Sequence, residues 1–207
     1  MKAILFNHFR CPLNRYTFSV APVRAWVESV CKGRVLNLFA GKTKLAVDET
    51  RNDLDPEVPA DYHLDALEFL RRWKGEKFDT ILLDPPYAYR KSMEMYKGMV
   101  CSPFRKLKDA IPACLHPAGV MVTFGYHSIV MGSSRGFQLE QLTLFSHGGA
   151  IHDTIVRVER YCAAQTFSAS GGRAVSFFPS PGKTGKGEGK IKGQIRKISA
   201  TINCTHE

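Results

Sequence analysis

Hydrophobic and polar positions divide the first 160 residues into short apolar runs that alternate with amphipathic segments. Apolar runs bounded by glycine or proline are typical of buried strands, and apolar residues spaced three to four apart indicate helices. The predicted helices are residues 21–30, 66–73 and 92–114, the last interrupted at Ser102-Pro103. The predicted strands are residues 34–40, 51–54, 61–65, 78–83 and 120–125.

The end of this region has a different pattern. Residues 138–145 and 151–161 alternate apolar and polar positions, and Gly148-Gly149 lies between them. Such alternation around a glycine turn predicts an antiparallel pair of strands. Strands separated by helices and followed by a hairpin predict an α/β fold with a mainly parallel central sheet, an antiparallel terminal hairpin and helices on both faces.

Length and charge set the domain organisation and the kind of partner. The chain has 207 residues and a net charge of +10, which favours a polyanionic partner such as nucleic acid. We expect one domain at residues 1–165 and a basic tail rich in Gly, Ser and Lys at 166–207. The tail has too little apolar surface to order itself, so it is expected to be flexible. It could settle on phosphates, or only keep the protein soluble.

Membrane and metal chemistry find no support in the sequence. It has no run of about 20 apolar residues and no charged-then-apolar leader, so a soluble, cytoplasmic protein is expected. Its six cysteines are scattered, without a Cys-x-x-Cys pair. We therefore expect reduced thiols and no metal site.

The tetrapeptide Asp84-Pro85-Pro86-Tyr87 directly follows the apolar run Thr80 to Leu83. Two prolines make a rigid turn, while an ionised carboxylate accepts hydrogen bonds and an aromatic ring can lie against a flat heterocycle. Together they suit a planar base with an amino group, whose nitrogen would be held by its hydrogens. The alternative is that Pro-Pro only ends a strand and Asp84 caps a following helix.

A second strand end with a glycine lies upstream, at residues 35–41. It continues as Ala40-Gly41-Lys42-Thr43, which imitates the end of a phosphate-binding P-loop. That motif requires a glycine five residues before Gly41, where this chain has Leu36, and a long helix after Thr43. The connection from Lys42 to Thr50 has room for only about two helical turns. A nucleotide hydrolase is therefore not expected.

With both strand ends in place, the chain resembles the class I S-adenosylmethionine-dependent amino-methyltransferases that carry the Asp-Pro-Pro-Tyr motif. The resemblance covers roughly the first 160 residues and implies a Rossmann-like methyltransferase fold with S-adenosyl-L-methionine as cofactor. Thr43 stands where the family's loop usually has a second glycine. The implied catalytic residues are Asp84, Pro85, Pro86 and Tyr87. The residues implied to hold the cofactor are Asn37, Leu38, Phe39, Ala40, Gly41, Asp53 (with Asp55 as fallback), Asp65 and Ala66. Phe18 would belong to a segment that closes over the cofactor.

The resemblance implies methyl transfer to the exocyclic N6 amine of adenine in DNA or RNA. Tyr89, Arg90, Lys91 and His127 are the expected substrate contacts, although a solvated basic loop and a structural histidine are the alternatives. Guanine N2 in RNA, cytosine N4 in DNA and a catalytically silent nucleic-acid-binding subunit remain open. No segment is long enough for a separate recognition domain, so target recognition would come from short loops, the basic tail or a protein partner.

Overall fold

The computed structural model describes residues 3–14, 16–85, 103–126, 130–149 and 152–162. These residues belong to a unit that spans Met1–Phe167. The remainder of the chain, Ser168–Glu207, lies outside the described residues. The predicted behaviour of the basic tail therefore stays a prediction.

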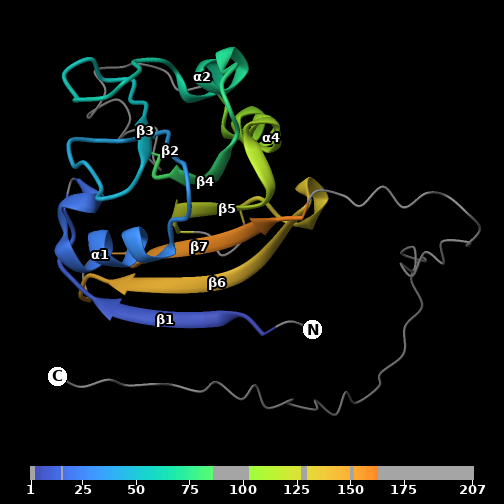
Figure 1. Cartoon of the computed structure of the whole chain (residues 1–207). Helices are drawn as coiled ribbons and strands as arrows, with labels where there is room; N and C mark the ends of the chain where they lie inside the picture. The colour runs from blue at the N-terminus through green and yellow to red at the C-terminus, as the bar shows by residue number, and fades with distance from the viewer. Residues whose placement is uncertain (1–2, 15, 86–102, 127–129, 150–151, 163–207) are drawn as a thin grey trace, which may run out of the picture. The chain divides into compact units, whose positions relative to one another are not determined.

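A seven-stranded sheet forms the centre of the unit (Figure 1). Its spatial order is β1-β6-β7-β5-β4-β2-β3. β7 pairs antiparallel with β5 and β6, and the other neighbouring strands pair parallel. This confirms the predicted Rossmann-like α/β class, with a mainly parallel sheet and an antiparallel hairpin. The strands are β1 (Leu5–Arg10), β2 (Val35–Asn37), β3 (Glu49–Arg51), β4 (Phe78–Leu83), β5 (Leu115–Gly125), β6 (Phe137–Ser146) and β7 (Thr154–Tyr161).

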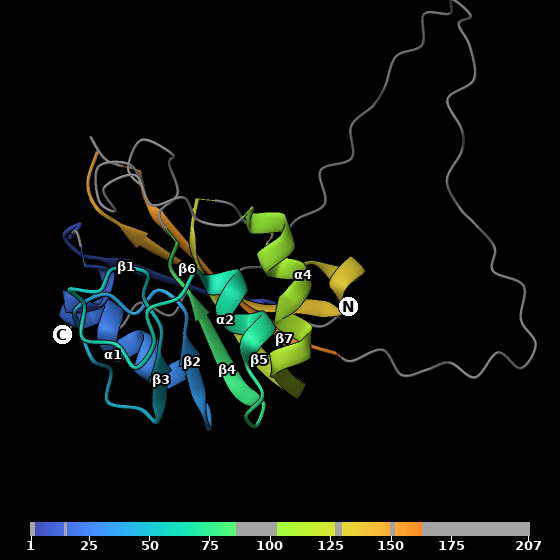
Figure 2. The same cartoon turned by 90° about the horizontal axis from the view of Figure 1, so that it is seen from above.

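Helices cover both faces of the sheet (Figure 2). The side chains of α1 and η1 pack with alternate residues of β4 and β5 in one hydrophobic cluster, and those of α2 and α4 pack in the other. In β4, Leu82 belongs to the first cluster, and Ile81 and Leu83 belong to the second. The helical segments are η1 (Thr17–Ser19), α1 (Ala21–Val30), α2 (Ala66–Arg72), α4 (Phe104–Cys114) and η2 (Ser133–Arg135).

Local sequence explains where the helices begin. Pro22 occupies the first turn of α1, where a missing N–H costs nothing. The Asp65 side chain caps α2 by accepting the N–H groups of Leu67 and Glu68, as expected for an N-cap aspartate. α4 begins directly after Pro103. The interruption that the sequence predicted at Ser102-Pro103 therefore coincides with the start of this helix. Within the described residues, no helix is long and apolar enough to cross a membrane.

The predicted third strand at residues 61–65 was wrong. Only an isolated bridge joins Tyr62 to Asn52 there. Backbone bonds join the segments near this bridge, where the Tyr62 N–H donates to Arg51 O and the Asp53 N–H donates to Tyr62 O, both at 3.1 Å. Side chains add to them: Asp61 accepts the Arg51 N–H at 2.7 Å, and the Asn52 amide bonds the backbone of Leu64 in both directions, at 3.0 and 3.2 Å. The strand predicted at 51–54 lies at Glu49–Arg51 instead.

The sequence pattern also missed β1. This strand adds to the edge of the sheet in parallel with β6, and its residues are exposed or half-buried, including Leu5 and Phe6, each 57% exposed. A short apolar run, residues 3–6, does precede and enter this strand, but it was not interpreted as one; at the edge of the sheet it stays more than half exposed at Ile4, Leu5 and Phe6.

The connection from β2 to β3 is short, as predicted, and its described residues 38–48 form no helix. Leu45 instead anchors it, packing with α1 at 2% exposure. The Leu45 N–H donates to Glu49 Oε1 at 2.9 Å, and the Ala46 N–H donates to Glu28 Oε1 at 2.8 Å. Without a helix after Thr43, the P-loop interpretation fails on structure as well as on sequence.

This anchoring predicts that Leu45→Ala lowers the free energy of unfolding by about 2–4 kcal/mol, because it leaves a cavity against α1. Urea denaturation measures the loss. Leu5→Ala is the matched control, since Leu5 is 57% exposed, and its effect should stay within about 0.5 kcal/mol. Equal effects of the two substitutions would show that Leu45 does not anchor the connection.

Candidate functional site

The candidate site lies where β2, β3 and β4 end. These strands are parallel neighbours, so their carboxyl ends meet at one edge of the sheet, where open α/β sheets bind ligands. Backbone bonds join the exits: the Leu38 N–H donates to Leu82 O at 3.3 Å, and the Asn52 N–H donates to Asn37 O at 2.9 Å. The segments that follow carry Gly41, Asp53 and Asp84, which the sequence singled out.

Gly41 is held from both sides. Its N–H donates to Asp53 Oδ2 at 2.8 Å, and its carbonyl accepts a bond from Arg51 Nη2 at 2.7 Å. Its φ of +56° is in the left-handed region, which favours glycine. The loop after β2 therefore has a defined conformation although no helix follows it.

Asp53 is 2% exposed and uses both carboxylate oxygens within the protein. Oδ2 accepts the Gly41 N–H, and Oδ1 accepts the Asp55 N–H at 3.0 Å. The Asp55 side chain accepts the Glu57 N–H at 3.0 Å. Asp53 is thus the carboxylate that contacts the glycine loop, which places it better than Asp55 for a role at this edge. Its contact with a cofactor stays a prediction.

Arg51 is a residue of the site that sequence reasoning missed. It is 5% exposed, and its Nε lies 3.6 Å from Glu49 Oε1. Burial raises the pKa of Glu49, and Arg51 is among the groups that lower it. Glu49 also accepts the Asn37 side-chain amide at 3.3 Å. The sequence signal that could have indicated Arg51 was the pair of opposite charges two residues apart in Glu49-Thr50-Arg51, which places both side chains on the same face of a strand.

Asn37, Leu38 and Ala40 lie buried at or just beyond the end of β2, and Phe39 is partly buried. Within the described residues, Asn37 Oδ1 is buried and accepts no hydrogen bond. Asp65 and Ala66 lie at the start of α2, where Asp65 Oδ1 caps the helix at 3.0 and 3.2 Å. The cap gives Asp65 a structural role, and its predicted contact with adenine of the cofactor is untested.

Asp84 follows β4 directly. Burial raises the pKa of its carboxyl from 3.8 to about 6, against the lowering effect of a hydrogen bond from the Thr17 side chain. Thr17 belongs to η1, ahead of α1. Its neighbour Phe18 is buried in the core, edge-on to Phe124 with ring centroids 5.3 Å apart. That its segment closes over a cofactor stays a prediction.

The described residues include Asp84 and Pro85 but not the rest of the predicted catalytic segment. The alternative that Asp84 caps a helix is therefore untested as well. Within the described ranges, no group of three His, Cys, Asp or Glu side chains could hold a metal ion. The predicted residues outside them are Pro86, Tyr87, Tyr89, Arg90, Lys91 and His127.

Comparison with known proteins gives structural likenesses only. No family model and no curated protein matches the chain. TrmN from Thermus thermophilus shares 18% identity, with a TM-score of 0.47 over 68% of this chain and 48% of TrmN. The N-methyltransferase NodS from Bradyrhizobium japonicum shares 15% identity, with a TM-score of 0.45 over 72% of this chain and 91% of NodS.

A third likeness is to the 1,6-didemethyltoxoflavin-N1-methyltransferase of Burkholderia thailandensis, solved with S-adenosylhomocysteine bound. The identity is 14% and the TM-score 0.49, over 69% of this chain and 77% of that protein. This chain spans about half the length of TrmN. At such identities and TM-scores, the function of this chain has to be inferred from its own residues.

The double hold on Gly41 predicts that Arg51→Met speeds hydrogen exchange at the Gly41 amide, because the loop loses its anchor on the carbonyl side. The substitution also leaves the buried Glu49 carboxylate without its positive neighbour, and it should lower the free energy of unfolding by about 3 kcal/mol. Mass-resolved or NMR hydrogen exchange measures the first effect.

Arg72→Met is the matched control. Arg72 is 66% exposed and pairs with Glu68 one turn earlier on α2, so its loss should cost less than about 0.5 kcal/mol. Unchanged Gly41 exchange in folded Arg51→Met protein would rule out the anchoring role.

Proposed function

We propose that this protein is an S-adenosylmethionine-dependent methyltransferase that acts on the exocyclic N6 amine of adenine in nucleic acid. The observation that carries the proposal is the Asp84 carboxyl. It follows β4 at the same edge as the Gly41 loop, and its pKa is raised to about 6. A carboxylate at a ligand-binding edge, able to accept the N–H bonds of an amine once it is ionised, supports amine recognition.

The chemistry needs positioning more than a strong base. The amine of adenine is a weak nucleophile, because its lone pair is delocalised into the ring. Ionised Asp84 and the Pro85 carbonyl would accept its two N–H bonds, draw the nitrogen toward tetrahedral geometry and aim its lone pair at the methyl donor. A new N–C bond would form as the S–C bond breaks with its electron pair staying on sulfur, and Asp84 would take the amine proton and pass it to solvent.

The residues present fit the cofactor. When bound, it supplies an electrophilic methyl group on a sulfonium. The loop Asn37 to Gly41 would hold its methionine part, Asp53 its ribose, and Asp65-Ala66 its adenine. The left-handed Gly41 supports this assignment, because its N–H donates to Asp53 Oδ2 at 2.8 Å and so brings the loop and the carboxylate together at one edge of the sheet.

The substrate side of the proposal rests on charge and on residues of the Asp84 segment. A net charge of +10 favours a polyanion. Tyr87 would stack on the base, Arg90 and Lys91 would meet phosphates, and Tyr89 and His127 would contact neighbouring groups. Guanine N2 and cytosine N4 remain the alternative amines. In a duplex the base would have to leave the stack, a cost that unpaired RNA avoids.

One observation favours a second candidate, a catalytically silent nucleic-acid-binding subunit. The Gly41 N–H and carbonyl and both oxygens of Asp53 already have partners inside the protein. Calorimetric titration with S-adenosylmethionine separates the candidates. Binding supports the enzyme, and its absence supports the silent subunit.

The decisive experiment incubates the protein with isotopically labelled S-adenosylmethionine and separate pools of DNA and RNA. Digestion and mass analysis then identify the modified nucleoside. N6-methyladenosine or its deoxy form supports the proposal; label on guanine or cytosine would move the activity to another amine.

The position of Asp84 predicts that Asp84→Asn abolishes methyl transfer yet leaves cofactor affinity within about twofold. The same change should stabilise the protein at pH 8 by roughly 1–3 kcal/mol, because the fold no longer has to hold a buried carboxylate. Kinetics, calorimetry and urea denaturation measure the three effects. Loss of cofactor binding in folded Asp84→Asn protein would place Asp84 in the cofactor site instead.

The raised pKa also predicts the pH dependence. Since the folded pKa of Asp84 is about 6 against 3.8 ordinarily, its contribution to stability falls as pH rises from about 4 to about 6. Transfer requires the ionised form, so kcat/KM should rise through half its maximum near pH 6. An acid limb centred near pH 4 would show that another carboxyl controls the reaction.

A further inference from the structure

The segment before α1 crosses the carboxyl edge of the sheet. Tyr16 and Phe18 are two residues apart in it, yet they contact different strand ends. A Cβ built on Gly41, after β2, would lie 3.8 Å from Tyr16 Cδ1, and the Phe18 ring lies edge-on to Phe124 of β5 at 5.3 Å. In the sheet, β4 lies between β2 and β5. The residue between the two aromatic side chains is therefore placed over the end of β4.

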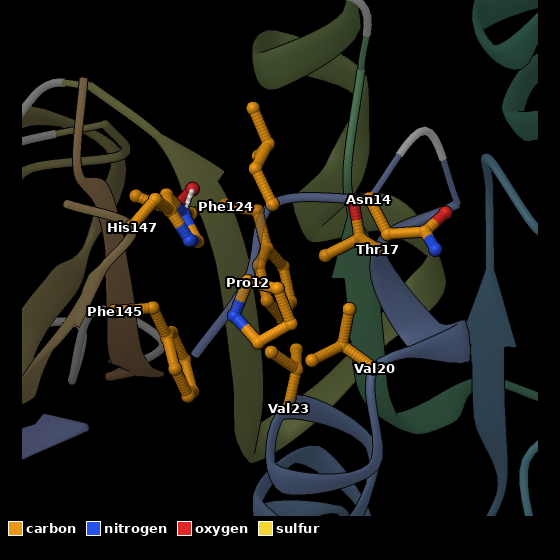
Figure 3. A pocket seen from close by; sticks show the side chains of 10 residues that line it. Pro12, Asn14, Thr17, Val20, Val23, Phe124, Phe145 and His147 are labelled. Atoms are coloured by element: carbon orange, nitrogen blue, oxygen red, sulfur yellow. Dashed lines mark hydrogen bonds between the residues drawn. The ribbon is translucent and has the colours of Figure 1, made fainter. Parts of the chain in front are cut away.

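That residue is Thr17, and its contacts agree with this position. Its side chain lines a small pocket together with Phe124 and Val20 (Figure 3). It also hydrogen-bonds the carboxyl of Asp84, the first residue after β4. Sheet order, ring contacts and this hydrogen bond thus place Thr17 at the same point of the edge.

The backbone around Thr17 is held by local hydrogen bonds. The Tyr16 N–H donates to Asn14 Oδ1 at 2.9 Å. The Tyr16 carbonyl accepts the N–H of Ser19 at 2.9 Å and its hydroxyl at 2.7 Å. The Val20 N–H donates to the Thr17 carbonyl at 3.3 Å. These bonds, and the restricted χ1 of a β-branched residue, leave the Thr17 hydroxyl few positions.

A carboxylate that accepts an amine needs a fixed orientation, because rotation about its Cβ–Cγ bond exchanges the two oxygens. A hydroxyl has one proton to donate. When Thr17 donates it to one oxygen of Asp84, the other oxygen remains for the amine. The same hydrogen bond favours the ionised carboxyl, which is the form that accepts an N–H.

We infer, on the basis of the proposed function, that Thr17 is a positioning residue for methyl transfer: its hydroxyl holds one oxygen of the Asp84 carboxylate so that the other faces the substrate amine. Thr17 acts through Asp84 and not through the cofactor or the base. Its loss therefore slows the transfer step and leaves the binding of both ligands nearly unchanged.

Substitutions in the full chain test the inference. Thr17→Val replaces the hydroxyl by a methyl group of similar size, and Thr17→Ser keeps the hydroxyl. Thr154→Val is the matched control, because Thr154 lines the same pocket while its hydroxyl lies 2.9 Å from His147 Nε2. Urea denaturation checks that each variant is folded, and Thr17→Ala serves in place of Thr17→Val if the latter is not.

Thr17→Val should lower kcat about tenfold or more, while the KM for a short single-stranded, adenine-containing oligonucleotide and the affinity for S-adenosylmethionine change by less than about twofold. The acid limb of kcat/KM should move to higher pH, because the Thr17 side chain lowers the pKa of Asp84 while burial raises it. Thr17→Ser should restore most of the rate. Thr154→Val should leave kcat and the acid limb unchanged.

Carbon-13 NMR titration of the Asp84 carboxyl, in protein without ligands, keeps the two possible failures apart. If no form of the protein methylates, the proposed function has failed, while a higher Asp84 pKa in Thr17→Val still supports the hold of Thr17 on the carboxyl. An unchanged Asp84 pKa, or an unchanged kcat where the wild type methylates, would overturn the role of Thr17.

Two further outcomes would also overturn the inference. Equal losses of kcat and of cofactor affinity in Thr17→Val would assign Thr17 to the cofactor. An equal loss of kcat in Thr154→Val would show that the packing of the pocket, and not the Thr17 hydroxyl, controls the rate.

Discussion

The hydrogen bonds that fix Gly41 are the constraint on which the ligand-binding edge depends. Doubly wound sheets usually orient the loop after the first parallel strand with a helix, but here the described residues from Leu38 to Asp48 form none. Arg51 and Asp53, at the end of the neighbouring strand, take over that task with one bond to the carbonyl and one to the N–H. The sheet itself thereby shapes the loop.

This arrangement places several buried charged groups at the ligand-binding edge of the sheet. Glu49, Arg51 and Asp53 are buried or nearly so along β3 and just beyond it. Burial also raises the pKa of the Asp84 carboxyl, at the end of β4. Burying charge opposes folding unless each group finds a partner. Here each named charge contacts the backbone of a loop or a hydroxyl, so electrostatic cost and loop geometry are coupled.

Sequence reasoning predicted the parts of the fold that have strong local signals. The buried run of β4, the proline at the start of α1 and the alternation in β6 and β7 all specify their elements without tertiary contacts. β1 was missed although the apolar run of residues 3–6 leads into it, because nothing local shows that this run pairs with β6 at the edge of the sheet. Residues 61–65 look like a strand, yet their backbone pairing is limited to an isolated bridge at Tyr62, and at Leu64 the Asn52 side chain makes the bonds instead. Arg51 was missed because its role depends on Gly41, ten residues away, and only the folded sheet brings the two together.

The position of β1 affects when the site can form. Its partner β6 follows about 135 residues later, and the bond from the Cys11 N–H to Ser146 O ties the segment that carries Asn14 and Thr17 to the far end of the sheet. Contacts so distant in sequence form late, because long loops must close first. During synthesis β1 therefore has no pairing partner until β6 has emerged from the ribosome. The residues beside Asp84 are among the last parts of this edge to reach their places.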